Sequence, residues 1–323
     1  MNATALGDLC ERLRAAKGMQ HKTDISLAYR GLAGGAAVCR VGDDCAAIPD
    51  GDGYLLFAIE GLLDEFVRRE PWFAGYCSVM VNLSDVAAMG GRPTAVVDAL
   101  WTASHERGAE IFAGMRAAAD AYGVPIVGGH INARSDGDRL AVAVVGRARR
   151  LLTSFDARPG DALLAAIDLR GAYYEPYPYW NCSTAAPSER LRGDLAVLAE
   201  LADDGLCRAA KDISMGGVLG TLLMLMECSE IAANVRLDRI PIATQASLER
   251  WLVSFPSFGY LLAVAPEFVD AVRQRFGRRG IACAAFGTCL PGSALTVELA
   301  GEREVFWDLA GSPFTGAAAD ALV

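Results

Sequence analysis

Residues 81–93, VNLSDVAAMGGRP, decide the fold that this sequence predicts. Most of them are apolar, and a glycine pair followed by a proline closes the stretch, so they predict a buried helix with a defined end. Asn82 and Asp85 are three residues apart and would project from one face of that helix. Burying such polar groups costs roughly 2–7 kcal/mol each unless a partner satisfies them. The stretch leaves two explanations open: a bound cation with a phosphate, or a network of backbone hydrogen bonds.

Length and composition limit what the chain can be. With 323 residues, 53% of them hydrophobic, it can bury a large core, and two domains are expected. The net charge of −9 argues against a surface that binds nucleic acid. Apolar runs such as residues 218–226 are too short to span a membrane, and the charged N-terminal stretch is unlike a signal peptide. We therefore expect a cytoplasmic protein with no membrane partner and no nucleic-acid partner.

The cysteines and histidines do not form a metal-binding pattern. Nine cysteines are scattered without a CxxC pair, and most have apolar neighbours, which is typical of reduced core thiols. The three histidines are far apart in the sequence. Neither a P-loop, nor a G-x-G-x-x-G after a strand, nor a G-x-S-x-G motif occurs. If the chain handles a nucleotide, it does so with acidic residues and a metal.

Acidic residues stand at the ends of two elements ahead of the helix. In residues 41–49, VGDDCAAIP, Asp43 and Asp44 precede a short apolar run. Adjacent carboxylates repel and are usually solvated turn residues, and a divalent cation is the main partner that favours holding two together. Glu60 ends the next apolar strand, where a functional acid and a surface acid are equally consistent with the sequence.

The first half of the chain alternates helices and strands, which indicates an α/β unit of about 150 residues. An amphipathic helix is predicted over residues 1–18, followed by a mobile glycine-containing segment over 19–37, where Lys22 could reach a phosphate or remain solvated. Beyond the central stretch we expect a strand at 94–101, a helix at 110–122, a buried strand at 124–132 and a strand at 140–146. The buried strand carries Gly128, Gly129 and His130, where the glycines would allow a close backbone approach to a ligand.

The second half contains two stretches of functional interest. The aromatic segment 171–184, GAYYEPYPYWNCST, has no helix or strand period, and a substrate-covering lid and an interface loop are both consistent with it. In KDISMGGVLGTL, Asp212 and Ser214 precede an apolar helix that Gly216 opens. Free N–H groups at such a helix start suit a phosphate, whereas an ordinary N-cap would use the same residue types.

Several stretches, taken in order, resemble one family. They are VGDDCAAI, AIEGLLDEF, NLSDVAAMGGRP and VGGHIN, with KDISMGGVLGTL and SFPSFGYLLAV in the second half. The sequence is similar to the AIR synthetase-like (PurM-like) superfamily over roughly residues 38–300. That superfamily contains AIR synthetase, thiamine-monophosphate kinase, selenophosphate synthetase and the hydrogenase-maturation carbamoyl dehydratase.

The resemblance implies an α/β fold of the α+β type and a homodimer. Its N-terminal domain would have a mixed sheet that forms a barrel with the partner subunit, with ATP and Mg²⁺ bound beside it, and an α+β C-terminal domain would follow. The expected segments are an N-terminal helix and mobile segment at 1–37, the N-terminal domain at 38–156 and the C-terminal domain at 157–323.

The resemblance also assigns roles to individual residues. The implied metal ligands are Asp43, Asp44, Glu60 and Asp85. The implied nucleotide contacts are Asn82, Gly128, Gly129 and His130. The implied substrate contacts are Asp212, Ser214, Gly216 and Lys22.

The sequence departs from the family pattern at three places. Ile59-Glu60 replaces Thr-Asp, and Gly128-Gly129-His130-Ile131 replaces Gly-Gly-Asp-Thr. Magnesium prefers oxygen ligands, so His130 would contact phosphate or substrate, or the metal count would be lower. Ser214-Met215-Gly216 replaces the Ser-Asp-Gly of the kinase, which weakens that assignment. No Cys-Lys or selenocysteine-Lys pair in a glycine-rich N-terminal segment supports selenophosphate synthesis.

The leading hypothesis is therefore an ATP- and magnesium-dependent enzyme that activates an amide, carbonyl or phosphate oxygen of a small molecule by phosphoryl transfer. One alternative is a non-catalytic relative that keeps the fold and binds a nucleotide or a partner. A further alternative is a small-molecule kinase similar to thiamine-monophosphate kinase. The residues do not name the substrate.

Overall fold

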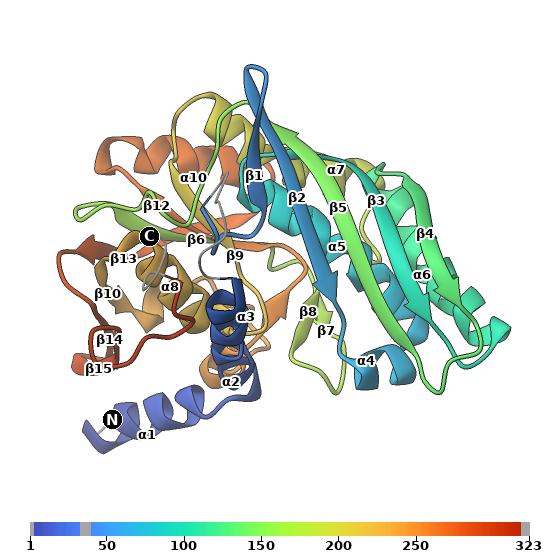
Figure 1. The fold of residues 1–323 in the computed structure, drawn as a ribbon. Coiled ribbons are helices and arrows are strands. Elements are labelled where there is room, and N and C mark those ends of the chain that lie inside the picture. The colour runs from blue at the N-terminus through green and yellow to red at the C-terminus, as the bar shows by residue number, and fades with distance from the viewer. Residues whose placement is uncertain (1–2, 33–39, 318–323) are drawn as a thin grey trace. The chain divides into compact units, whose positions relative to one another are not determined.

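The computed structural model describes residues 3–32 and 40–317, and the chain forms two compact units (Figure 1). Unit 1 comprises Met1–Asp43, Leu152–Ser183 and Asp204–Val323, and unit 2 comprises Asp44–Leu151 and Thr184–Asp203. The chain passes from unit 2 to unit 1 at Leu151, close to the predicted boundary after residue 156. Residues 184–203, however, belong to unit 2 again.

Unit 2 is built on a mixed five-stranded sheet. Its strand order is β1 (Ala46–Asp50), β2 (Gly53–Gly61), β5 (Arg139–Ala148), β3 (Arg92–Trp101) and β4 (Ile126–Asn132). All neighbours are antiparallel except β3 and β4, which run parallel. The helices of the unit are α4 (Asp64–Arg69), α5 (Pro71–Ala88), α6 (His105–Tyr122) and α7 (Ser188–Asp203). α5 packs against β2, β3 and β5 on one side and contacts α6 and α7.

Helix α5 confirms the helix predicted from residues 81–93. Pro71 begins it, and all but one of its 18 residues are buried. Gly90 follows with a positive φ of 72°, so the chain leaves the helix where the glycine pair predicts. α5 and α6 touch through glycines: a Cβ on Gly114 would lie 1.8 Å from the Trp72 carbonyl oxygen, and one on Gly75 would lie 2.1 Å from that of Ile111. α5 is thus a fixed, buried support for Asn82 and Asp85.

The sheet of unit 2 leaves one face uncovered by its own helices. Phe57 and Ile59 point to that face from β2, and Ile59 is in register through Ala143 with Val97 on β3. Their side chains are 50%, 64% and 40% exposed, respectively. The prediction of a buried strand at 124–132 is wrong, because β4 is an edge strand with a single neighbour and is exposed along most of its length.

Unit 1 contains a seven-stranded sheet and a smaller three-stranded one. The order of the larger sheet is β15 (Glu302–Asp308), β14 (Ala294–Leu299), β10 (Ala232–Arg236), β13 (Ala282–Leu290), β6 (Ala162–Ile167), β12 (Gly259–Val264) and β9 (Ala209–Asp212). Its helices are α1 (Ala3–Arg14), α2 (Lys17–Thr23), α3 (Ile25–Leu32), α8 (Gly217–Ser229), α9 (Leu248–Leu252) and α10 (Val269–Arg278), with 3-10 turns at Leu237–Arg239 and Pro266–Phe268. Together, the two units give the mixed α/β architecture that the sequence predicts.

The N-terminal segment is more ordered than its glycines suggest. The prediction of a mobile segment over 19–37 is wrong for residues 19–32, most of which lie in α2 and α3, and residues 33–37 lie outside the described residues. A Cβ on Gly18 would lie 1.7 Å from the carbonyl oxygen of Met215. Gly18 is therefore needed for contact between α2 and the segment before α8, not for mobility.

The aromatic segment 171–184 is a docked hairpin rather than an irregular loop. It contains β7 (Ala172–Tyr173) and β8 (Tyr179–Asn181), and β8 also pairs with β11 (Phe255–Pro256). The guanidinium of Arg250 donates to both carboxylate oxygens of Glu175 at 2.9 and 2.8 Å, and its Cζ lies 3.7 Å from the ring centroid of Tyr173. These contacts hold the hairpin against α9 within unit 1.

The described cysteines agree with the prediction of reduced core thiols. Eight are free, and all of these except Cys283 are buried. Burial raises the pKa of the Cys207 thiol to about 12, which keeps it protonated at neutral pH. Among the helices that the structure describes, none has the length and apolar character needed to cross a membrane.

Candidate active site

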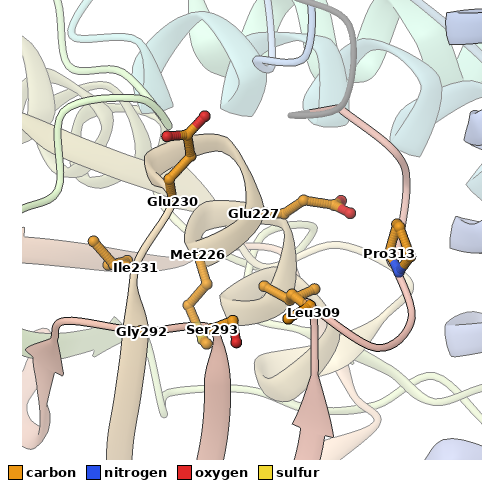
Figure 2. Close-up of a pocket in the computed structure, with 9 residues that line it drawn as sticks. Met226, Glu227, Glu230, Ile231, Gly292, Ser293, Leu309 and Pro313 are labelled. Carbon is orange, nitrogen blue, oxygen red and sulfur yellow. The ribbon is translucent and has the colours of Figure 1, made fainter.

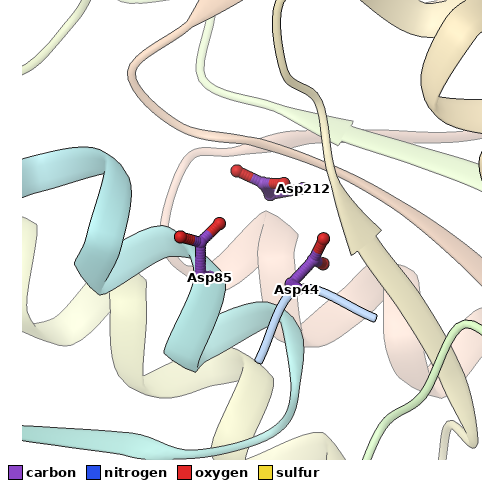
Figure 3. A group of neighbouring side chains, drawn as sticks. All are labelled: Asp44, Asp85 and Asp212. Carbon is purple, nitrogen blue, oxygen red and sulfur yellow. The ribbon is translucent and has the colours of Figure 1, made fainter. Parts of the chain in front are cut away.

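Asp44 and Asp85 lie side by side in unit 2. Asp85 is buried on α5, and Asp44 is half-buried in the bend that precedes β1. One carboxylate oxygen of each lies within 4.8 Å of the other (Figure 3). Two carboxylates this close repel each other unless a cation or proton lies between them. The structure thus brings together two of the predicted metal ligands; the third residue in Figure 3, Asp212, belongs to unit 1.

The side-chain amide of Asn82 has an unused acceptor one helical turn before Asp85. Asn82 is fully buried, and its Nδ2 donates to the Ser78 carbonyl at 2.8 Å. Its buried Oδ1 accepts no hydrogen bond from the described residues. An unsatisfied buried acceptor costs about 1–3 kcal/mol. A backbone hydrogen bond therefore satisfies only the Nδ2 of this amide. A cation or its bound water would satisfy the Oδ1.

The donor set of α5 and the Asp44 bend fits magnesium. Carboxylate and amide oxygens are the hard ligands that Mg²⁺ prefers, and it commonly takes one or two carboxylates together with water and phosphate oxygens. Asp44, Asp85 and the orphaned Oδ1 of Asn82 supply such oxygens within one unit.

Asp43 has structural contacts that the sequence does not predict. Its Oδ2 accepts from the Ser154 backbone N–H at 2.8 Å, and its Oδ1 accepts from the Ser154 hydroxyl at 2.7 Å. Both residues belong to unit 1. Asp43 therefore ties the chain before Asp44 to the segment around residue 154, and its role as a metal ligand remains a prediction.

The other predicted residues of unit 2 lie on exposed strands. Glu60 is exposed near the end of β2 and is not in the carboxylate group that contains Asp44 and Asp85 among the described residues. His130 on β4 makes an edge contact with Trp101, with 6.4 Å between ring centroids. Gly129 leaves room for the carboxylate of Asp98, since a Cβ at position 129 would lie 2.2 Å from the Asp98 Oδ1.

In unit 1, the residues predicted to contact substrate gather at the start of α8. Gly216 is the N-cap of α8 and no side chain caps the helix, so neither Asp212 nor Ser214 is an ordinary N-cap. Asp212 is buried at the end of β9. The Ser214 Oγ is buried and has no hydrogen-bond partner among the described residues.

Lys22 joins this group from the N-terminal part of the chain. A Cβ added to Gly216 would lie 3.4 Å from the Lys22 Cγ, so the lysine stem runs beside the helix start. The uncapped N–H groups of α8, its positive dipole end and a nearby ammonium together favour an anion such as phosphate. The structure thus places Lys22 with Gly216, although they are far apart in sequence.

Models of one protein family match both halves of the chain. The N-terminal domain of AIR synthase related proteins matches residues 42–148, and their C-terminal domain matches residues 184–300. The chain belongs to the AIR synthase related family. The superfamily predicted from the motifs between residues 38 and 300 is thereby confirmed.

Relatives of this AIR synthase related protein include proteins named as kinases. The uncharacterized protein sll0787 of Synechocystis sp. is 47% identical over 320 residues, which cover 98% of this chain and 99% of the relative. The thiamine-monophosphate kinase of Halobacterium salinarum is 28% identical over 279 residues, 81% of this chain and 94% of the kinase. The selenide, water dikinase of Myxococcus xanthus is 27% identical over 190 residues, 55% of this chain and 54% of the dikinase.

Several solved structures share the fold. T. maritima PurL complexed with ATP superposes with a TM-score of 0.74 at 20% identity, covering 88% of this chain and 49% of PurL. This AIR synthase related chain thus spans about half of the PurL chain. AaThiL complexed with AMPPCP and TMP has a TM-score of 0.66 at 18% identity, covering 88% of this chain and 96% of AaThiL. At these identities the likeness establishes the fold.

Two buried ionisable residues in this AIR synthase related protein were not predicted from its sequence. Lys211 on β9 is 4% exposed and Asp98 on β3 is 8% exposed. Each lies in an apolar strand pattern, where a single charged residue gives no signal of its burial. The Oδ2 of Asp98 has no hydrogen-bond partner among the described residues, and burial raises the pKa of this carboxyl group above its ordinary value.

The substitution Asp98→Asn is expected to stabilise the fold at neutral pH. The unfolded state releases the Asp98 proton at a lower pH than the folded state, so stability falls as pH rises from the unfolded pKa through the raised folded pKa. The variant should therefore have the higher Tm at pH ~7 and nearly the same Tm as the parent at pH ~3, below both pKa values. Thermal melts across this range measure the difference in Tm, and a variant with the lower Tm at neutral pH would contradict the absence of a hydrogen-bond partner for the Asp98 Oδ2.

Proposed function

We propose that this protein is an ATP- and Mg²⁺-dependent enzyme that transfers a phosphoryl group to an oxygen of a small molecule. The observation that carries the proposal is the pair Asp44 and Asp85, with the orphaned Oδ1 of Asn82 one turn away on α5. Solved family members complexed with ATP, ADP and AMPPCP, and relatives named as kinases, support the same nucleotide chemistry.

The residues divide into two roles. Asp44, Asp85 and Asn82 would hold Mg²⁺, with Asp43 and Glu60 as further candidate ligands. When bound, the ion supplies charge that clamps phosphate oxygens and offsets the charge that develops during transfer. Gly128, Gly129 and His130 remain candidate nucleotide contacts, and the exposed imidazole suits a phosphate or substrate group better than magnesium.

The start of α8 would hold a phosphate group or the acceptor substrate. Its backbone N–H groups and Lys22 would orient anionic oxygens, and the buried Ser214 hydroxyl would gain a hydrogen-bond partner. The carboxylate of Asp212, also near the start of α8, would orient the acceptor or a second ion. Because the transition state has little covalent contact with the protein, such positioning accounts for most of the catalysis.

Calorimetry with ATP in the presence and absence of Mg²⁺ tests this function. We expect binding that requires Mg²⁺, followed by ADP release when a phosphoryl acceptor is supplied. Magnesium-dependent binding with no turnover over a panel of amides, carboxylates and phosphate esters would instead favour the non-catalytic relative, which the exposed positions of Glu60 and His130 also suit. Absence of ATP binding would contradict the assignment of these residues to a nucleotide site in either function. ADP formation with thiamine monophosphate as acceptor would identify the kinase alternative.

We also infer that the protein forms a homodimer through the uncovered face of the unit 2 sheet. Phe57, Ile59 and Val97 expose apolar side chains there, and Val127 on the edge strand β4 is 63% exposed. A second copy of the same face would bury them, and exposed apolar patches of this kind mark interfaces.

The substitution Ile59→Asp is expected to separate the dimer into monomers, because it places a charge within the apolar face. Sedimentation velocity should give twice the chain mass for the parent protein and the single-chain mass for the variant. Ala113→Asp, at an exposed position of α6, is the matched control and should remain dimeric. A monomeric parent, or a dimeric Ile59→Asp variant, would rule out this interface.

A further inference from the structure

A pocket at the C-terminal end of α8 lies within unit 1 and has a volume of about 300 Å³ (Figure 2). Three segments line it: the last turn of α8 with the two residues after it, the turn between β13 and β14, and the chain that follows β15. Figure 2 shows Met226, Ser293 and Leu309 on one side, with Glu227 on the last turn of the helix and Glu230 just after that turn above them. The volume suits a small molecule of a few heavy atoms.

The pocket combines apolar walls with negative charge. Met226, Ile231, Leu309 and Pro313 supply apolar surface, and no lining residue is basic. Glu230 is exposed, and no cation among the described residues pairs with its carboxylate. α8 is 13 residues long, and its dipole places partial negative charge at this end. An organic cation with a short apolar body complements both properties.

Glu227 adds a second, fixed negative charge that no side-chain cation neutralises within the described chain. Its buried carboxylate accepts from the backbone N–H groups of Phe314, Thr315 and Gly316 at 2.7, 2.8 and 3.1 Å, and from the Thr315 hydroxyl at 2.5 Å. These hydrogen bonds hold the segment after β15 in place as a wall of the pocket. The wall is therefore preformed, which limits the entropy lost on binding.

The backbone at Glu230 is consistent with a role for its side chain. Glu230 adopts a left-handed conformation, with φ of 54°, where glycine is the favoured residue. A glutamate there costs about 1 kcal/mol more than glycine would. Glu230 also lines the pocket.

We propose that this pocket binds a small primary alkylammonium ion, at a site separate from the candidate phosphoryl-transfer residues. The apolar walls would contact the alkyl chain, and Glu230, with the C-terminal end of α8, would attract the ammonium group. The candidate phosphate site lies at the opposite end of the same helix, about 20 Å away for a helix of 13 residues. The inference does not depend on the proposed function.

Titration with n-butylammonium, 1-butanol and butyrate tests the proposal on the intact protein. Backbone amide shifts of Ser293 and Ala310 in NMR spectra report where the probe binds. We expect n-butylammonium to shift both amides, 1-butanol to bind about tenfold more weakly, and butyrate not to bind. Equal affinities for the three probes, or amide shifts that leave Ser293 and Ala310 unmoved, would overturn the proposal.

Variants at Glu230 separate the carboxylate from the backbone. Glu230→Gln and Glu230→Gly should each weaken n-butylammonium binding about fivefold, the upper range for a partly exposed ion pair. Glu230→Gly should also raise the Tm, since glycine suits the left-handed backbone, so loss of binding would not reflect loss of folding. Glu267→Gln, an exposed acid of unit 1 that does not line the pocket, is the charge-matched control and should bind as the parent does. Unchanged affinity in both Glu230 variants would refute the role of its carboxylate.

Discussion

Asp85→Asn is expected to lower magnesium-dependent ATP turnover by about 10²–10³-fold. The substitution keeps the shape of the side chain on α5 but removes one of the two charges that would hold the cation. A bound metal ion contributes several kcal/mol to stabilising transferring phosphates, and each ~1.4 kcal/mol is a factor of ten in rate. Steady-state ADP release at saturating ATP, repeated over a range of Mg²⁺ concentrations, measures the effect.

The dependence of activity on Mg²⁺ concentration shows whether Asp85 is a metal ligand or only stabilises α5. Loss of a ligand should raise the Mg²⁺ concentration needed for half-maximal activity while the Tm of the metal-free protein stays equal or rises, because a buried charge has been removed. Asp52→Asn, at an exposed acid in the turn between β1 and β2, is the control and should retain parental activity. An Asp85→Asn variant with parental turnover would remove the basis of the proposed function.

Gly114→Ala is expected to lower the free energy of unfolding by about 2 kcal/mol and the Tm by roughly 5 °C. Helix propensity alone predicts the opposite sign, since alanine stabilises a helix interior by about 0.5–1 kcal/mol relative to glycine. The Cβ would lie 1.8 Å from the Trp72 carbonyl oxygen, so α5 and α6 must move apart to admit it. Thermal and urea unfolding decide between the two signs.

Gly7→Ala is the matched control for this prediction. Gly7 lies within α1, and a Cβ there would meet no atom within 4 Å. The control should therefore be stabilised by about 0.5–1 kcal/mol, as helix propensity alone predicts. A Gly114→Ala variant as stable as the parent or more stable would contradict the close contact between α5 and α6. Because α5 carries Asn82 and Asp85, the displaced helix should also weaken ATP binding.

The sequence predicts α5 and its two polar residues, Asn82 and Asp85, well because the signal there is local. Polar residues within an apolar run, closed by a glycine pair, constrain both the helix and its end. The short spacing from Asn82 to Asp85 places both on one face whatever the rest of the chain does. The family resemblance implies that both Asp43 and Asp44 are ligands. The structure distinguishes them, because Asp43 bonds to Ser154, which is distant in sequence, whereas Asp44 lies beside Asp85.

The predictions that failed depend on neighbours that a single sequence does not reveal. The strand at 126–132 is apolar enough to suggest burial, yet its exposure is set by having β3 on one side only. The glycines before residue 33 suggest mobility, whereas Gly18 is a contact point with Met215. The closeness of Lys22 to Gly216 and the burial of Asp98 likewise arise from tertiary packing, which local propensity does not encode.

The return of α7 to unit 2 bears on how the protein can be made and divided. α7 packs against α5 and α6, yet in the sequence it follows the second stretch of unit 1, Leu152–Ser183. During synthesis, the surfaces of α5 and α6 that α7 covers stay exposed until Asp203, the last residue of α7, has left the ribosome. A fragment that ends at the family-domain boundary near residue 148 would lack α7. We therefore expect that the N-terminal half cannot be exchanged between relatives as an independent folding unit.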